Sequence, residues 1–185
     1  MLSPTAYRSK ASPITCAEDD GAWLYSDEGN AFFQVAADYN LIASIAGRPS
    51  YQPAAQSCRT FPRNADPLPS PCGGQGRRGA PHPNLNEILA SAALPNMYIK
   101  LSGFHYCSTV PWGSLYSDTH WVIRALYERF GPYRMCGGSD YPVVRKAMTY
   151  QHALEAFRTH CTFVPDADKA WILGNTLAGL LEKAR

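Results

Sequence analysis

Short apolar strands alternate with amphipathic helices along much of this chain, and this order constrains the fold more than any other feature. Residues 97–102 alternate apolar and polar side chains, which predicts a strand with one apolar face. A helical stripe follows in 117–130 and a second short strand in 133–137. Strands joined by helices form a mainly parallel sheet, either open or closed into a barrel. The sequence therefore predicts an α/β protein whose ligands bind at the carboxyl ends of the strands.

Other segments carry the same two patterns. The further expected elements are a helix at 27–39, a buried strand at 41–46, a helix at 84–92 and two helices after residue 149. Residues of the type that caps helices precede three of the predicted helices. They are Ser117 or Asp118, then Thr149, then Asp166.

Charge and length exclude several classes of protein. The 17 basic and 15 acidic residues give a formal net charge of +2, too small to indicate binding to nucleic acid or to an anionic membrane. No apolar run approaches the roughly 20 residues that cross a bilayer, and no signal-peptide core is found at the N-terminus. We therefore expect a cytoplasmic protein without a membrane or nucleic-acid partner. Its six cysteines are then expected to be free thiols.

Two segments lack a regular pattern. Residues 1–21 are predicted to form a poorly ordered lead before one domain at 22–185. Residues 57–83 hold only Phe61 and Leu68 as large apolar side chains, too few to offset a backbone entropy of roughly 1–2 kcal/mol per residue. We expect this stretch to be disordered or extended, to supply no core strand and to leave a gap in the sheet. It is either an irregular insert or the product of a reading-frame disturbance.

Asp140 is the residue best placed for chemistry. It follows a predicted strand and the two glycines Gly137 and Gly138, and it lies just before Pro142. At the carboxyl end of a strand, such a carboxylate can bind a metal or act as a general base on water. The same Ser-Asp sequence also forms ordinary turns and helix caps, and on residue type alone that interpretation is the more frequent one.

Other polar residues follow the same two strands. In a barrel, Lys100 would point inward from its strand, whereas on an edge strand it would be solvated. Its neighbours in the following loop are candidate contacts for a substrate, and they are equally typical of a plain loop. The candidate substrate-binding residues are Lys100, Ser102, His105, Tyr106 and Tyr141. The remaining histidines of the predicted helices are expected near helix ends or on their surfaces, namely His120, His152 and His160.

Three sequence blocks resemble the closing half of the amidohydrolase-related family. They are NMYIKLSG at 96–103, FGPYRMCGGSDYP at 130–142 and ILGNTLAGLL at 172–181, in the family's order and spacing. The resemblance covers residues 84–185 well and 22–56 loosely. The group is similar to lactonases and to 2-pyrone-4,6-dicarboxylate hydrolase, and it includes decarboxylases.

This resemblance implies a (β/α)8 TIM barrel in which Asp140 matches the aspartate at the end of the eighth strand. That aspartate binds the metal where one is present and moves the proton of the attacking water. The intact family is expected to use one divalent ion, zinc or manganese. No His-x-His pair is found here, and only His82 falls where a strand-ending histidine belongs. Both a metal-bound and a metal-free chain therefore stay open.

The resemblance also bears on completeness and activity. A (β/α)8 barrel takes about 250 residues, so 185 residues imply an incomplete barrel that lacks the opening strands. The predicted function is a hydrolase that adds water to a lactone, a related carboxylic ester or a cyclic substrate, with Asp140 as general base and then acid. Its partner would be a small carboxylate or lactone, and a homo-oligomer is allowed. Two alternatives stay open: a catalytically silent family member or interaction module, and a decarboxylase of the same superfamily.

Overall fold

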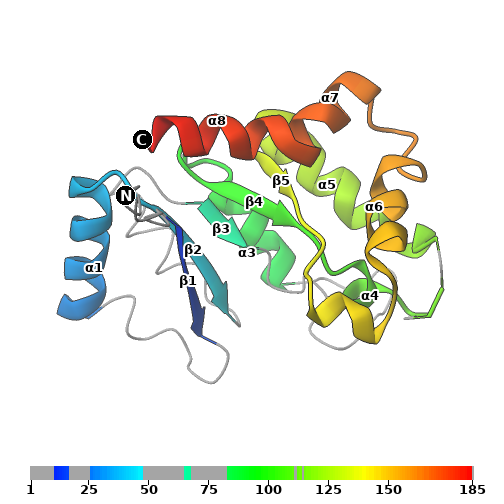
Figure 1. Ribbon diagram of the computed structural model, residues 1–185, viewed down its shortest axis with the longest axis horizontal. Coiled ribbons are helices and arrows are strands. Elements are labelled where there is room, and N and C mark those ends of the chain that lie inside the picture. The colour runs from blue at the N-terminus through cyan, green and yellow to red at the C-terminus, as the bar shows by residue number, and fades with distance from the viewer. Residues whose placement is uncertain are drawn as a thin grey trace, which may run out of the picture.

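The strands of the protein are parallel and follow one another in chain order. The computed structural model describes residues 11–16, 26–47, 65–67, 83–110, 112–113 and 115–184. The strands in these ranges are β1 (Ala11–Cys16), β2 (Ile42–Gly47), β3 (Ala65–Pro67), β4 (Tyr98–Leu101) and β5 (Met135–Gly137). β1 pairs with β2, while β3, β4 and β5 form a second ladder, and every one of these pairs is parallel. β2 lies beside β3, so the two ladders continue each other (Figure 1).

Helices follow the strands and cover the sheet. They are α1 (Asp27–Asp38), α3 (Pro83–Ser91), α4 (Phe104–Cys107), α5 (His120–Phe130), α6 (Tyr150–Arg158), α7 (Asp166–Ala170) and α8 (Thr176–Lys183). Short turns of other helix types are η2 (Ser117–Thr119), η3 (Pro132–Arg134), η4 (Val143–Lys146) and the π-helical η5 (Trp171–Asn175). α7, η5 and α8 form one continuous helical run along β5 (Figure 1). The alternation predicted from the sequence is therefore confirmed.

The apolar face of β4 lies in the core. Ile99 and Leu101 are each 4% exposed, whereas Tyr98 and Lys100, which alternate with them along the strand, are half-buried. The core cluster also holds Leu126 of α5 and further apolar side chains from α3, α6 and η5. Burial of such side chains contributes about 25 cal/mol per Å² of apolar surface, which makes this cluster the main source of stability. The polar side of β4 is left free for a site.

Two strands occur where the sequence pattern assigned none. β1 lies within residues 1–21, and its Pro13 is tolerated because β1 pairs only with β2 in the described part of the chain and Pro is allowed in such an edge strand. β3 lies within 57–83 and pairs with β4, which corrects the expectation of a gap without a strand. A strand of three residues is too short to show a periodic pattern of apolar side chains, so the sequence pattern could not predict β3. The rest of 57–83, including His82, lies outside the described residues.

The predicted helix caps are confirmed in one case and wrong in two. The Thr149 hydroxyl accepts a hydrogen bond from the backbone N–H of His152 at 3.2 Å. Asp118 caps no helix: its carboxylate accepts hydrogen bonds from the backbone N–H and the hydroxyl of Thr109. Asp166 lies in the first turn of α7, behind the N-cap residue Pro165, and its carboxylate accepts a hydrogen bond from Lys169. The N-cap residue is Thr119 for α5 and Pro165 for α7, so both helices begin at a residue other than the predicted cap.

Two smaller expectations concern side-chain environment. Cys107, Cys136 and Cys161 are free thiols, as predicted, while the other three cysteine side chains lie outside the described residues. His120 was expected at the surface, but its Nε2 is buried without a hydrogen-bond partner and its ring packs edge-on against Phe163. No helix in the described ranges has the length and apolar character needed to span a membrane.

Candidate active site

The site forms where β4 and β5 end at the same edge of the sheet. In the parallel register Lys100 lies opposite Cys136, and Leu101 lies opposite Gly137. The chain then leaves β4 through Gly103, whose φ is +70°, and leaves β5 toward Asp140, whose φ is +59°. Gly and Asp are among the residues that adopt this left-handed conformation most readily. Both exits therefore turn sharply, and the polar residues beyond the two strands stay close together.

Lys100 and Asp140 form an ion pair across this edge. The Lys100 Nζ lies 3.3 Å from Asp140 Oδ1, and the two side chains are 37% and 25% exposed. Gly138 makes this contact possible, because a Cβ at that position would lie only 2.8 Å from the Lys100 Cε. The lysine therefore crosses β5 over a residue without a side chain. This geometry shows that the polar face of β4 points to the site rather than to open solvent.

His105 adds a third polar group from α4. Burial lowers the pKa of His105 below its usual value of 6.5, and the nearby negative charge of Asp140 partly offsets this effect. The imidazole is thus neutral near pH 7, so it can donate one hydrogen bond and accept another. A base, a cation and a neutral imidazole come together here, which is a set suited to proton transfer around an anionic or polarised substrate.

The remaining predicted site residues are Ser102, Tyr106 and Tyr141. Ser102 is half-buried in the turn after β4. Tyr106 belongs to α4, but its side chain lies outside the described residues. The Tyr141 side chain is 62% exposed, and its backbone N–H donates to the Ser139 hydroxyl at 3.2 Å. Only Lys100, His105 and Asp140 are therefore brought together by the described structure.

Cys136 faces the same side as Lys100 but is not a reactive thiol. Burial raises its pKa to about 11, so it is protonated at neutral pH. The thiolate is the nucleophilic form of cysteine. Its role next to the lysine is therefore packing.

A divalent metal does not fit the described residues. No group of three His, Cys, Asp or Glu side chains lies close enough together within the described ranges to hold an ion. The carboxylate of Asp140 already faces an ammonium group, which competes with any cation for the same oxygen. Zinc sites of catalytic type use three protein ligands, and Asp140 with His105 supplies at most two. We therefore derive no step of the chemistry from a metal.

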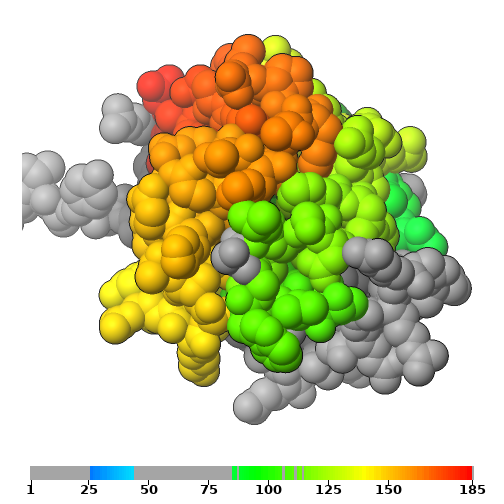
Figure 2. All heavy atoms as spheres, turned by 90° about the vertical axis from the view of Figure 1, so that its right-hand side faces the viewer, coloured from blue at the N-terminus to red at the C-terminus, as the bar shows by residue number. Residues whose placement is uncertain are grey.

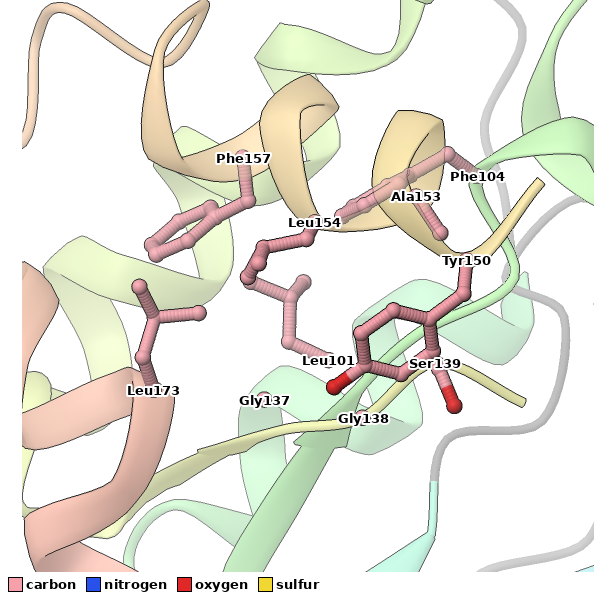
Figure 3. A pocket seen from close by; sticks show the side chains of 10 residues that line it. All are labelled: Leu101, Phe104, Gly137, Gly138, Ser139, Tyr150, Ala153, Leu154, Phe157 and Leu173. Atoms are coloured by element: carbon pink, nitrogen blue, oxygen red, sulfur yellow. The ribbon is translucent and has the colours of Figure 1, made fainter. Parts of the chain in front are cut away.

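An apolar cavity lies beside the ion pair and was not foreseen from the sequence. It has a volume of about 70 Å³ and lies between the ends of β4 and β5, α6 and η5 (Figure 3). On the face shown in Figure 2, the segment that follows β4 (green) lies directly against α6 and the loop before it (orange and yellow). Its lining residues, such as Leu154 and Phe157, carry the helical apolar spacing of any core residue. The sequence pattern alone therefore cannot distinguish residues that line the cavity from ordinary core residues.

Comparison with known proteins supports the family resemblance seen in the sequence. The family model described as Amidohydrolase matches residues 69–180, which confirms the resemblance of the three sequence blocks. Curated proteins gave no match. Among solved structures, a protein from Pseudomonas putida named as a candidate 2-pyrone-4,6-dicarboxylic acid hydrolase is similar, with a TM-score of 0.76 and 16% identity over 94% of this chain and 63% of its own.

Two more solved structures are similar. A candidate 2-pyrone-4,6-dicarboxylic acid hydrolase from Acinetobacter baumannii with citric acid bound has a TM-score of 0.69 and 16% identity. An amidohydrolase from Burkholderia multivorans with bound zinc has a TM-score of 0.68 and 17% identity. Each likeness covers 92% of this chain and 63% of the other. The chain thus resembles part of the fold of these proteins and spans less than two thirds of their length.

Proposed function

Because this chain belongs to the amidohydrolase family, we propose that Asp140 serves a hydrolase site that adds water to a lactone or a related carboxylic or cyclic ester. The observation that carries this proposal is the ion pair of Lys100 and Asp140 at the carboxyl ends of two neighbouring parallel strands. In barrels of this kind the active site lies at that end of the strands. We further propose that β1 to β5 belong to an incomplete barrel, since the chain spans 63% of its relatives.

The proposed reaction needs one proton carrier. A carboxylate oxygen of Asp140 takes a proton from water while the water oxygen bonds to the carbonyl carbon of the ester. The resulting tetrahedral oxyanion collapses, and the bond from carbon to the ester oxygen breaks. Asp140 then returns its proton to the leaving alkoxide, which gives a hydroxy acid and restores the carboxylate. Atoms and charge balance without a co-reactant.

Lys100 and His105 position the substrate in this scheme. The ammonium group of Lys100 can bind a carboxylate of the substrate or the developing oxyanion, as charge-assisted hydrogen bonds do. The neutral imidazole of His105 can donate to the same substrate. The names of two relatives and the citric acid bound to one of them support a substrate that carries carboxylates. Tyr106, Tyr141 and Ser102 remain proposed contacts at its edge.

The test is an assay of the full chain with 2-pyrone-4,6-dicarboxylate and a panel of lactones. General base catalysis contributes about 10² to 10⁴ in rate, so Asp140→Asn should lower kcat at least 100-fold. Asp166→Asn is the matched control, because that side chain is 99% exposed and should leave kcat unchanged. Full turnover by Asp140→Asn would remove Asp140 from the mechanism. Release of CO2 instead of a hydroxy acid would favour the decarboxylase, and binding without any turnover would favour a silent family member.

The domain division and cellular setting are proposals of the same kind. We propose one domain that comprises residues 22–185 together with β1, which pairs with β2. We propose that it is cytoplasmic, with a small-molecule partner and no nucleic-acid partner. We also propose a homo-oligomeric state, which size-exclusion chromatography can measure. We propose that the irregular composition of 57–83 comes from a reading-frame disturbance, with the frame restored near residues 80–85. Translating the encoding DNA in its other two frames tests this idea. If neither frame yields an apolar strand that ends in histidine, the segment is a genuine insertion.

A further inference from the structure

The cavity beside the ion pair has an apolar wall. Its six hydrophobic lining residues are Leu101, Phe104, Ala153, Leu154, Phe157 and Leu173. Leu101 and Phe157 are only 4% and 2% exposed, so the wall is part of the packed core. Such a surface gives a water molecule few hydrogen-bond partners, and small apolar cavities in proteins hold apolar groups better than water.

The cavity also has a polar end, and this end adjoins the reacting groups. Gly138, Ser139 and Tyr150 line it, and Figure 3 shows Ser139 and Tyr150 at one end with Phe157 and Leu173 at the other. Ser139 directly precedes Asp140 in the chain. Gly138 lies under the Lys100 side chain, since a Cβ there would be 2.8 Å from Lys100 Cε. Gly138 therefore borders both the cavity and the Lys100 side chain, so a single glycine separates the cavity from the ion pair.

The wall farthest from the polar end is held in place by η5. A Cβ at Gly137 would lie 3.2 Å from the Ile172 carbonyl oxygen and 3.3 Å from Leu173 Cδ2, so η5 packs directly on β5. The π-helical turn is a rare geometry that occurs often at functional sites. Together these contacts fix Leu173 as one side of the cavity, so its size is set by the fold rather than by a mobile side chain.

We propose that this cavity is a subsite for a short alkyl substituent on a carboxylate or lactone substrate. The inference rests on the proposed function for the position of the reacting ester. A cavity needs roughly 10–15 Å³ of volume to hold a single water, and 70 Å³ is several times that minimum. We therefore expect it to accommodate a short alkyl chain, on the order of three to five carbon atoms. Charged substituents are disfavoured, because none of the residues that line the cavity carries a charge.

Binding of linear carboxylates tests the subsite without relying on turnover. Calorimetry measures the binding of five linear acids to the full chain: acetate, propionate, butyrate, pentanoate and heptanoate. We expect the carboxylate of each acid to bind Lys100. Each added methylene should tighten binding roughly fourfold until the cavity is full near pentanoate, after which the Kd stays constant. Ala153→Leu should fill the cavity and abolish this dependence on chain length. Lys100→Met should weaken all five acids by one common factor and leave the dependence intact.

A second variant covers the case in which Ala153→Leu does not fold. Leu173→Ala should enlarge the cavity, so that heptanoate binds more tightly than pentanoate. The subsite is disproved if the wild-type Kd does not depend on chain length, or if both variants keep the wild-type dependence. Turnover is measured separately on lactones with the same substituents. If the Kd depends on chain length but no lactone is turned over, the subsite stands and the proposed hydrolase function is disproved. If lactones are turned over but the Kd does not depend on chain length, the hydrolase function stands and the subsite is disproved.

Discussion

The two ends of the β4 and β5 pair are built in opposite ways. At the amino end, Arg134 donates from its guanidinium to the backbone carbonyls of Ala92 and Leu94 at 2.9 Å and of Phe130 at 3.2 Å. These bonds tie the turn after α3 and the end of α5 to the start of β5. At the carboxyl end, one ion pair of 3.3 Å joins Lys100 to Asp140, and both side chains are partly exposed.

This difference separates stability from chemistry. Three hydrogen bonds from one partly buried cation lock backbone in place, whereas a solvated ion pair contributes little to stability, commonly 0–1 kcal/mol. Barrels of this class show the same division, with the amino end of the strands serving stability and the carboxyl end serving function. Substitutions at the two ends should therefore separate loss of activity from loss of stability.

Among substitutions at the two ends of the strand pair, Lys100→Met is expected to give the largest change, and that change should fall on activity rather than on stability. A hydrogen bond to a charged group is worth about 1.5–3 kcal/mol, so KM for a carboxylate-bearing substrate should rise roughly 10- to 150-fold. The free energy of unfolding in urea should change by less than about 1 kcal/mol. A large loss of stability with unchanged KM would contradict the comparison.

Arg134→Met should show the opposite effect. The variant leaves the carbonyl oxygens of the turn after α3 and of the end of α5 without this donor, so the free energy of unfolding should fall by about 2–3 kcal/mol. At a temperature where the variant is folded, its kcat/KM should match that of the wild type. Arg129→Met is the control, since Arg129 is exposed and donates once, to the Leu89 carbonyl. Equal decreases in the free energy of unfolding of the two variants would show that the hydrogen bonds of Arg134 do not specially stabilise the amino end.

Gly138→Ala tests the path of the lysine between the two ends. The new Cβ would meet the Lys100 Cε at 2.8 Å, and the flexible side chain would give way and lose its contact with Asp140. We expect kcat/KM to fall about tenfold, or about 1.4 kcal/mol, with a smaller change in stability. Gly179→Ala in α8 is the control, because a Cβ there meets nothing within 4 Å. Unchanged activity in Gly138→Ala would mean that the lysine has another path.

The smallest expected effect is a loss of stability at acidic pH, and it depends on His120. Burial lowers the pKa of His120 below 6.5, and the positive charges of His160 and Arg124 lower it further, while Asp118 acts in the opposite direction. As the pH falls below 6.5, the unfolded chain binds this proton before the folded chain does, so the free energy of unfolding decreases. His120→Gln should reduce this decrease between pH 7 and pH 5. The exposed His152, changed to Gln, is the control. An identical pH profile in both variants would exclude His120.

Much of the fold followed from local sequence. The strand at β4, the helix at α5 and the Thr149 cap were predicted because each depends on residues only a few positions apart. Asp140 was singled out for a similar reason, since two glycines and a proline around an aspartate mark a sharp turn after a strand. The family resemblance then supplied its role as an expectation.

Other features depend on residues that meet only in the folded chain. β3 is defined by backbone pairing with β4, about 30 residues away, and its own side chains carry no period. The approach of Lys100 to Asp140 spans 40 positions and requires Gly138 to lie beneath the lysine stem. The cavity is made of core-like residues from both strands, α6 and η5. The sequence by itself determined the elements and the candidate base, because short-range periods and turn residues encode them. Only tertiary packing decided what the base faces and what shape of substrate fits beside it, because both arise where distant segments come together.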